Sequence, residues 1–60
     1  MKIEENENCF EVEVSVELLE DDTPVIMFTS EKSEFGFDVA QAKTAVIALQ
    51  HFIETGELPE

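Results

Sequence analysis

Few side chains in this chain could act as a nucleophile or a general base, and Cys9 and His51 are the only pair of that kind. Nucleophilic catalysis needs such a pair in contact and oriented by a third group, and nothing in the sequence brings the two together. Cys9 also shares strand parity with Glu11 and Glu13, and a negative environment disfavours a thiolate. We interpret Cys9 as a small residue near the start of a strand and His51 as a solvated helix residue.

The carboxylates offer a second kind of chemistry, beginning with the segment "EDDT" at residues 20–23. Calcium loops space their oxygen ligands as D-x-[DN]-x-[DN]-G with a distal Glu, and that spacing is missing. A solvated turn is therefore favoured, with weak divalent-cation binding as the alternative. The two glycines, Gly36 and Gly56, make no phosphate-binding loop. We expect no enzyme activity, no catalytic residue, no resident metal and no cofactor.

A row of glutamates lies along the segment "FEVEVSVELLE" at residues 10–20. On a strand, Glu11 and Glu13 point the same way about 6.7 Å apart, and Glu17 extends the line. This spacing is of the same order as that of phosphates on one nucleic-acid strand. A solvated face that prevents edge-to-edge aggregation is the alternative. The residues expected to bind a partner are Glu11, Glu13, Glu17, Glu20, Asp21, Asp22, Glu31 and Glu34.

Net charge narrows the class of partner. The chain has 60 residues and a formal charge of −12, so we expect one domain. Residues 1–38 hold twelve acids and two lysines, whereas residues 39–60 hold three acids and one lysine. Nucleic acids and anionic membranes need a basic surface, so we expect neither as a direct partner. With one cysteine and an acidic start that lacks a signal-peptide layout, the expected setting is reducing and cytoplasmic.

Hydrophobic patterning predicts the elements that position these residues. Residues 1–8 are polar and predict a flexible acidic arm with Ile3 as its anchor. Alternating apolar and polar residues predict a strand over residues 9–18, and the apolar run at residues 25–30 predicts a second. Residues 34–37 predict a short third strand, in which Gly36 marks a bulge or a close backbone contact. Residues 9–37 therefore form a predicted antiparallel β-meander.

A helix is predicted over residues 39–55. Asp38 and Gln41 match a capping box, and Gly56 with the later Pro59 ends the helix. One stripe on this helix is apolar and should cover the sheet; it comprises Val39, Ala42, Val46, Leu49 and Ile53, and Ala45 and Phe52 widen it. The predicted fold is a small two-layer α+β domain, ββ(β)α, in which a two- or three-stranded meander packs against one C-terminal helix.

Some apolar residues have no predicted place in this monomer. A chain of this length buries a small core and usually needs a disulfide, a metal or a partner subunit. Because one cysteine cannot form an internal disulfide, we expect a homodimer. The residues expected at its interface are Leu19, Val25, Met27 and Ile47. Scattered single exposures are the alternative interpretation.

Two functional hypotheses follow. The first is an acidic inhibitor or regulator that occupies the basic, nucleic-acid-binding surface of a target protein, as a DNA mimic does. By analogy, a free-standing acidic protein of this size suits a phage counter-defence role. The second is a homodimeric structural or adaptor module that uses its apolar surface, with the charge serving solubility alone.

Overall fold

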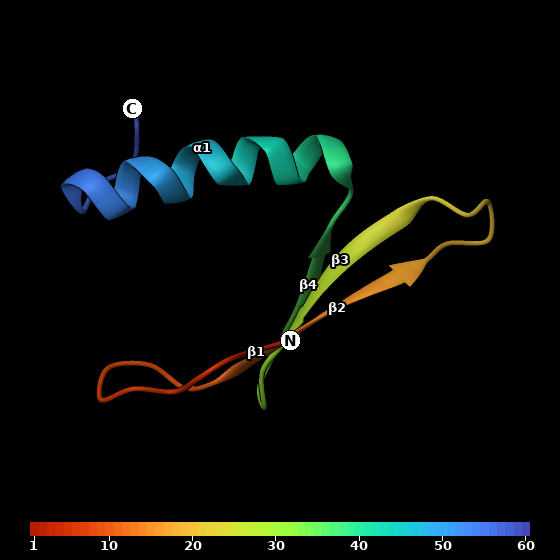
Figure 1. The fold of residues 1–60 in the computed structure, drawn as a ribbon, viewed down its shortest axis with the longest axis horizontal. Helices are drawn as coiled ribbons and strands as arrows, with labels where there is room; N and C mark the ends of the chain where they lie inside the picture. Colours follow the sequence, from red (N-terminus) through yellow and green to blue (C-terminus); the bar gives the residue numbers. More distant parts are fainter.

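The structure is a computed structural model that describes residues 1–60. The chain forms a four-stranded antiparallel sheet and one C-terminal helix, so the α+β meander fold is confirmed. The strands lie in the order β1-β2-β3-β4, and α1 follows β4 (Figure 1). The elements are β1 (Lys2–Ile3), β2 (Val12–Leu18), β3 (Pro24–Thr29), β4 (Glu34–Phe37) and α1 (Val39–Thr55).

Strand β1 was not predicted, because it lies in the segment expected to be a flexible arm. It pairs with β2, with Lys2 opposite Glu13 and Ile3 opposite Val12. The chain reverses between β1 and β2 through a turn in which the Asn6 side chain accepts hydrogen bonds from the backbone N–H groups of Asn8 and Cys9, both at 2.9 Å. This turn takes up the first residues of the predicted strand, so β2 begins three residues later than expected.

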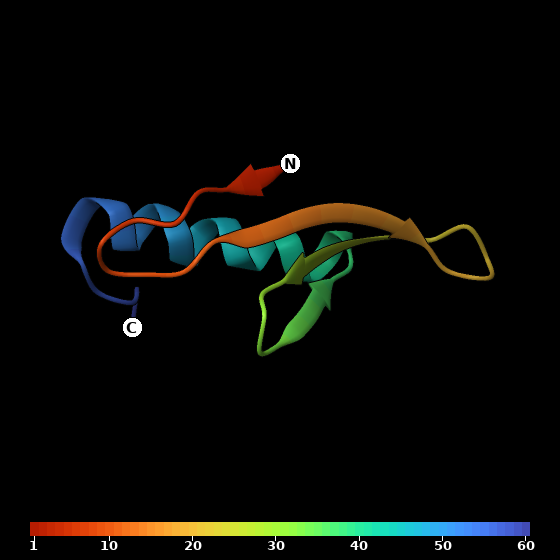
Figure 2. The ribbon, with the colours of Figure 1, turned by 90° about the horizontal axis from the view of Figure 1, so that it is seen from below.

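The central hairpin joins β2 to β3 through a short acidic turn. The Leu19 carbonyl accepts from the Asp22 N–H at 2.9 Å, and Asp22 has a left-handed backbone with φ of 66°. Asp tolerates this conformation better than most residues. Figure 2 shows this turn at one end of the molecule and the turn of residues 6–9 toward the other.

One face of the sheet, here called the inner face, carries apolar residues from every strand. Strand pairing aligns Val14 with Phe28 and Phe35, and Val16 with Ile26 and Phe37. The rings of Phe28 and Phe35 stack with centroids 5.1 Å apart, and Phe37 meets each of them edge-on. Val14 is the one buried residue, at 8% exposure.

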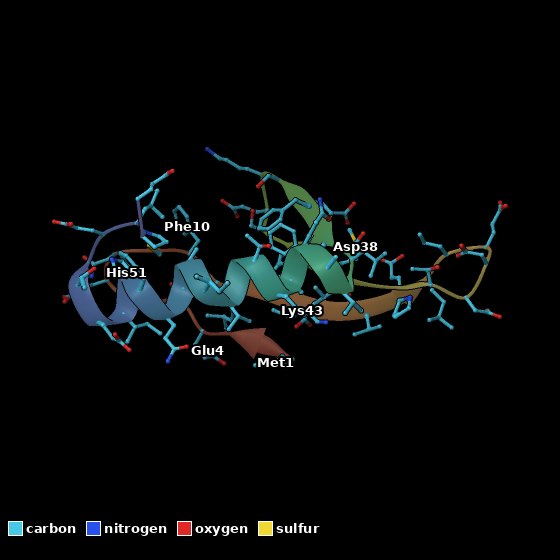
Figure 3. The ribbon with its side chains drawn as sticks, turned by 90° about the horizontal axis from the view of Figure 1, so that it is seen from above. Met1, Glu4, Phe10, Asp38, Lys43 and His51 are labelled. Atoms are coloured by element: carbon cyan, nitrogen blue, oxygen red, sulfur yellow. The ribbon has the colours of Figure 1, made fainter.

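Helix α1 is held at both ends as the sequence predicts. The Gln41 N–H donates to Asp38 Oδ1 at 2.8 Å and the Asp38 N–H donates to Gln41 Oε1 at 3.3 Å, which completes the capping box. Gly56 ends the helix with φ of 78°, and its N–H donates to the Phe52 carbonyl at 2.7 Å. Figure 3 shows Asp38 at the start of α1 and His51 near its other end.

The packing of α1 differs from the prediction. The backbone of α1 approaches β3 and β4 and neither β1 nor β2. The helix side beside Phe37 carries small and polar residues, among them Ala45 and Ala48. The apolar stripe expected to cover the sheet lies beside this contact, and four of its members are exposed: Val39, Val46, Leu49 and Ile53. Periodicity placed these residues on one side of the helix, but the prediction that this side covers the sheet was wrong, because periodicity does not report the direction in which the helix leaves β4.

Candidate functional site

The outer face of the sheet carries the polar positions of β2. Residues opposite one another across the sheet share a face, and the row that begins with Lys2 continues through Glu13, Thr29 and Glu34. The next row runs from Ser15 through Met27 to Gly36, and Glu17 faces Val25. Beside Ser15 and Glu17, the outer face of β3 carries the apolar side chains of Met27 and Val25. The acidic row of β2 therefore does not extend across β3 at these positions.

Two cations lie beside Glu13 of β2 and Glu11, the residue before β2. The Met1 ammonium is 3.7 Å from Glu13 Oε2, and Lys2 Nζ is 3.6 Å from Glu11 Oε2. All four side chains are substantially exposed, and exposed ion pairs of this kind contribute about 0–1 kcal/mol. The pairs leave Glu11 and Glu13 accessible from solvent and reduce the local negative potential in part.

A shallow hollow of about 250 Å³ lies beside these glutamates. Four carboxylates and two hydroxyls line it together with one aromatic ring; its residues are Glu5, Phe10, Glu11, Glu13, Thr29, Ser30 and Glu31. We call this surface the acidic hollow. Three of its acids, Glu11, Glu13 and Glu31, belong to the predicted partner-binding set. Glu5 was not predicted, because the turn at Asn6 brings it back beside β2.

The acidic residues of the β2–β3 turn form a separate group. Glu20, Asp21 and Asp22 lie at the opposite end of β2 from the acidic hollow (Figure 2). Glu17 is exposed on the strand between the two groups. Glu34 lies beside the hollow instead, where its Oε2 accepts a hydrogen bond from Thr29 Oγ1 at 3.4 Å. The structure therefore divides the predicted binding set between the two ends of the sheet.

The surroundings of Asp21, in the β2–β3 turn, lower the pKa of its carboxyl group. Hydrogen bonds from Thr23, first from its side chain and then from its backbone N–H, hold the pKa of Asp21 below the ordinary value of 3.8. The N–H of Thr23 lies 3.1 Å from Asp21 Oδ1. These bonds favour the ionised form, so the turn keeps its charge to lower pH than a free aspartate would.

The chemistry that the acidic hollow allows is recognition of positive charge. No group of three His, Cys, Asp or Glu side chains is placed to hold a metal ion. Separated carboxylates can instead each accept hydrogen bonds from the ammonium of a lysine or the guanidinium of an arginine. Phe10, which also lines the hollow, offers an aromatic surface on which a guanidinium can stack. The hollow therefore presents negative charge and one aromatic ring, which are complementary to a basic side chain.

The four residues expected at a dimer interface lie on different surfaces. Val25 and Met27 are half-buried on the outer face, where they lie close to Gly36. Leu19 is exposed in the β2–β3 turn, and Ile47 is exposed on α1. The structure does not bring these four side chains together, and it reveals other exposed apolar residues on the inner face and along α1.

Two further findings bear on the class of protein. Cys9 is exposed and unpaired in the turn that precedes β2, and α1 falls short of the length and apolar character that crossing a membrane requires. Comparison with protein-family models, with curated proteins and with solved structures finds no match.

Proposed function

We propose that this protein is a small acidic binding module that docks its acidic hollow on a basic, nucleic-acid-binding surface of a target protein. The observation that carries the proposal is the meeting of Glu5, Glu11, Glu13 and Glu31 around one accessible depression. A formal charge of −12 on 60 residues makes the whole molecule attractive to such a surface. Complementary charge of this kind accelerates association and selects the partner.

The mechanism we propose is competition for a shared basic surface. A lysine or arginine of the target enters the acidic hollow, where it meets carboxylates in place of phosphate oxygens. Glu34 lies next to the hollow, and Glu17 continues the acidic surface along β2. While the module is bound, the target cannot engage its nucleic acid. The module thus acts as an inhibitor or regulator of the target.

A charge-removal experiment tests this proposal. The triple variant E11Q/E13Q/E31Q removes three charges from the hollow and keeps side-chain size. The matched control, E54Q/E57Q/E60Q, removes three charges from the C-terminal end of the chain. Proteins captured from lysate at low salt by the wild type, and released by added duplex DNA, should be lost with the hollow variant and kept with the control.

Two outcomes would contradict the proposal. One is capture of the same DNA-releasable proteins by the hollow variant and the control. The other is an absence of captured proteins that duplex DNA can displace. Circular dichroism of each variant establishes that the fold is intact before capture is compared.

The second candidate function, a homodimeric adaptor, is supported by a different observation. Large apolar side chains stand exposed along α1, including Leu49, Phe52 and Ile53. Exposed apolar surface of this extent marks an interaction site. For this candidate, partner capture should survive E11Q/E13Q/E31Q and depend on the apolar residues of α1.

A further inference from the structure

Part of the inner face of the sheet and most of the apolar stripe of α1 are left uncovered. On β2, Val16 and Leu18 point to the inner face and are exposed. On α1, Val46, Leu49 and Ile53 are spaced i, i+3, i+7, which places them on one side of the helix, and all three are exposed. Large contiguous patches of exposed apolar surface mark interaction sites on soluble proteins.

The dimensions of the chain show how much cover is missing. A folded monomer of 6.8 kDa is expected to expose about 4,000 Å², whereas this chain exposes 5319 Å². Its radius of gyration is 13.2 Å, against about 10.4 Å for a compact domain of 60 residues. Both measures indicate an open arrangement in which helix and sheet do not enclose a core of their own.

The connection between β4 and α1 explains why the helix does not close over its own sheet. Asp38 is the only residue between the two elements, and its capping box with Gln41 fixes the start of the helix. At 1.5 Å per residue, the 17 residues of α1 extend about 25 Å. From this fixed start α1 runs away from the β2–β3 turn, so the end of β2 that carries Val16 and Leu18 stays uncovered (Figure 1).

We propose that the missing cover is a second copy of this chain, bound so that the α1 stripe of each copy packs on the inner face of the other. A two-fold axis makes such contacts reciprocal, so each copy covers both uncovered surfaces of its partner. This inference deepens the adaptor candidate and does not depend on the acidic hollow.

The area available fits a stable dimer. A compact dimer of twice this mass would expose about 6,600 Å² in total, so association would bury about 4,000 Å². Obligate homodimers bury roughly 2,000–5,000 Å² in total. A compact assembly of two such chains also has a radius of gyration of about 13.6 Å, close to the 13.2 Å of one copy. In such a compact assembly the two copies would interpenetrate instead of touching at one edge.

Charge also favours a second copy over a different partner on these surfaces. The inner face and the α1 stripe carry no charged side chain, while the acids of β2 point to the outer face. Two highly negative chains can meet through the uncharged surfaces and keep their carboxylates in solvent. A partner attracted by negative charge would bind the outer face and leave the inner face exposed.

Mass and interchain contacts of the wild-type chain test the proposal directly. Sedimentation and light scattering from about 1 to 500 µM should give twice 6.8 kDa, and X-ray scattering should give a radius of gyration near that of one copy. In a mixed sample of labelled and unlabelled chains, isotope-filtered nuclear Overhauser effects should join methyl groups of Leu49 and Ile53 to those of Val16 and Leu18.

A matched pair of substitutions locates the interface. Ile53 and Ile47 are both exposed isoleucines of α1, at 79% and 63%, but Ile47 lies among Lys43, Gln50 and Glu54 on the polar side of the helix. I53E should raise the dimer dissociation constant at least about 30-fold, as loss of a central contact does. I47E should change it less than about 3-fold.

Three results would overturn the proposal. The first is a monomer at 500 µM. The second is a dimer that lacks interchain nuclear Overhauser effects between the methyl groups of α1 and those of β2. The third is an equal change in the dimer dissociation constant for I53E and I47E. If I53E fails to fold, the wild-type measurements still decide the matter, because they need no variant. Capture of proteins through the acidic hollow, and their release by duplex DNA, would still be expected if the chain were a monomer. The two proposals can therefore fail separately.

Discussion

Gly36 lies where a side chain would collide with the neighbouring strand. It is opposite Met27 in the β3–β4 ladder. A Cβ at this position would lie 2.5 Å from Met27 Sδ, 3.0 Å from the Ile26 carbonyl oxygen and 3.0 Å from Val25 Cγ1. The sequence analysis predicted a bulge or a close backbone contact here. The ladder continues without interruption through Gly36, so the close contact is the reason for glycine.

We expect G36A to lower the free energy of unfolding by about 1–3 kcal/mol, as overpacking does. Adding M27A should recover part of the loss, because the closest atom is the flexible end of the Met27 side chain. Urea denaturation of the single and double variants measures both effects. G56A is the control. An alanine at position 56 is strained by the φ of 78°, although no atom lies within 4 Å of its Cβ, so M27A should not recover the stability lost in G56A. An unchanged stability in G36A would contradict the packing at this site.

Asp21 provides a pH-dependent reporter of the β2–β3 turn. Thr23 lowers the pKa of Asp21 below its ordinary value of 3.8. The stability that the Asp21 carboxylate contributes is therefore present above the pKa of the unfolded state and is lost as pH falls through the lower pKa of the folded state. In T23V the pKa of Asp21 should rise toward 3.8, because the hydroxyl is gone. Carboxyl carbon NMR titration measures the shift. T29V, which removes a hydroxyl directed at Glu34, should leave Asp21 unchanged.

At the scale of elements, sequence patterns identified the longer strands and the helix because each carries its own local signal. Period-two alternation marked β2, and the capping residues Asp38 and Gly56 marked both ends of α1. β1 has two residues and no period. It exists because β2 offers an edge to pair with, and the Met1 ammonium donates to the Val14 carbonyl at 2.7 Å. That contact joins residues far apart in sequence, so no local pattern reports it.

The acidic hollow was predicted in part for a related reason. Period two predicts Glu11 and Glu13 on one side of the chain, and both line the hollow although β2 begins only at Val12. Glu5 joins them because the chain reverses at Asn6, and Asn is a common turn residue whose side chain bonds to nearby backbone groups. The polar segment "ENEN" at residues 5–8 thus held a turn signal. The division of the remaining acids between two ends follows from the length of β2.

The capping box of α1 sets the direction of the helix as well as its start. D38A should destabilise the protein by about 1 kcal/mol, because the Gln41 N–H loses its acceptor. Thermal unfolding followed by circular dichroism measures this change. Q41A removes the reciprocal and longer bond to the Asp38 N–H and should have a smaller effect. Q50A, outside the cap, is the control. Equal stability of D38A and Q50A would contradict the role assigned to the cap.

At the scale of the whole molecule, charge and apolar surface are separated in space. Most acidic side chains lie on the outer face or in the three connections between strands, whereas the inner face and the α1 stripe are uncharged. The two proposed interactions therefore use different surfaces and different forces. One depends on attraction between opposite charges across an exposed face. The other buries apolar area against the repulsion between two chains of charge −12.

This separation gives the two interactions opposite responses to salt. Raising NaCl from about 0.05 to 0.5 M shortens the screening length from about 14 to 4 Å. The repulsion between two copies then weakens, and the dimer dissociation constant should fall by about 10-fold. Capture of a basic partner should weaken by at least about 10-fold over the same range, because screening removes the attraction. Sedimentation and partner capture at matched salt concentrations measure the two effects.

The variant E11Q/E13Q/E31Q separates these responses further. With three fewer charges per copy, its dimer should be tighter than that of the wild type at 0.05 M salt and should change less as salt rises. Its partner capture should already be lost at low salt. A dimer that dissociates as salt increases would show that the copies meet through charged groups. That result would place the interface on the acidic outer face, where each copy would have to bring its few cations, Lys2 and the Met1 ammonium among them, against the carboxylates of its partner.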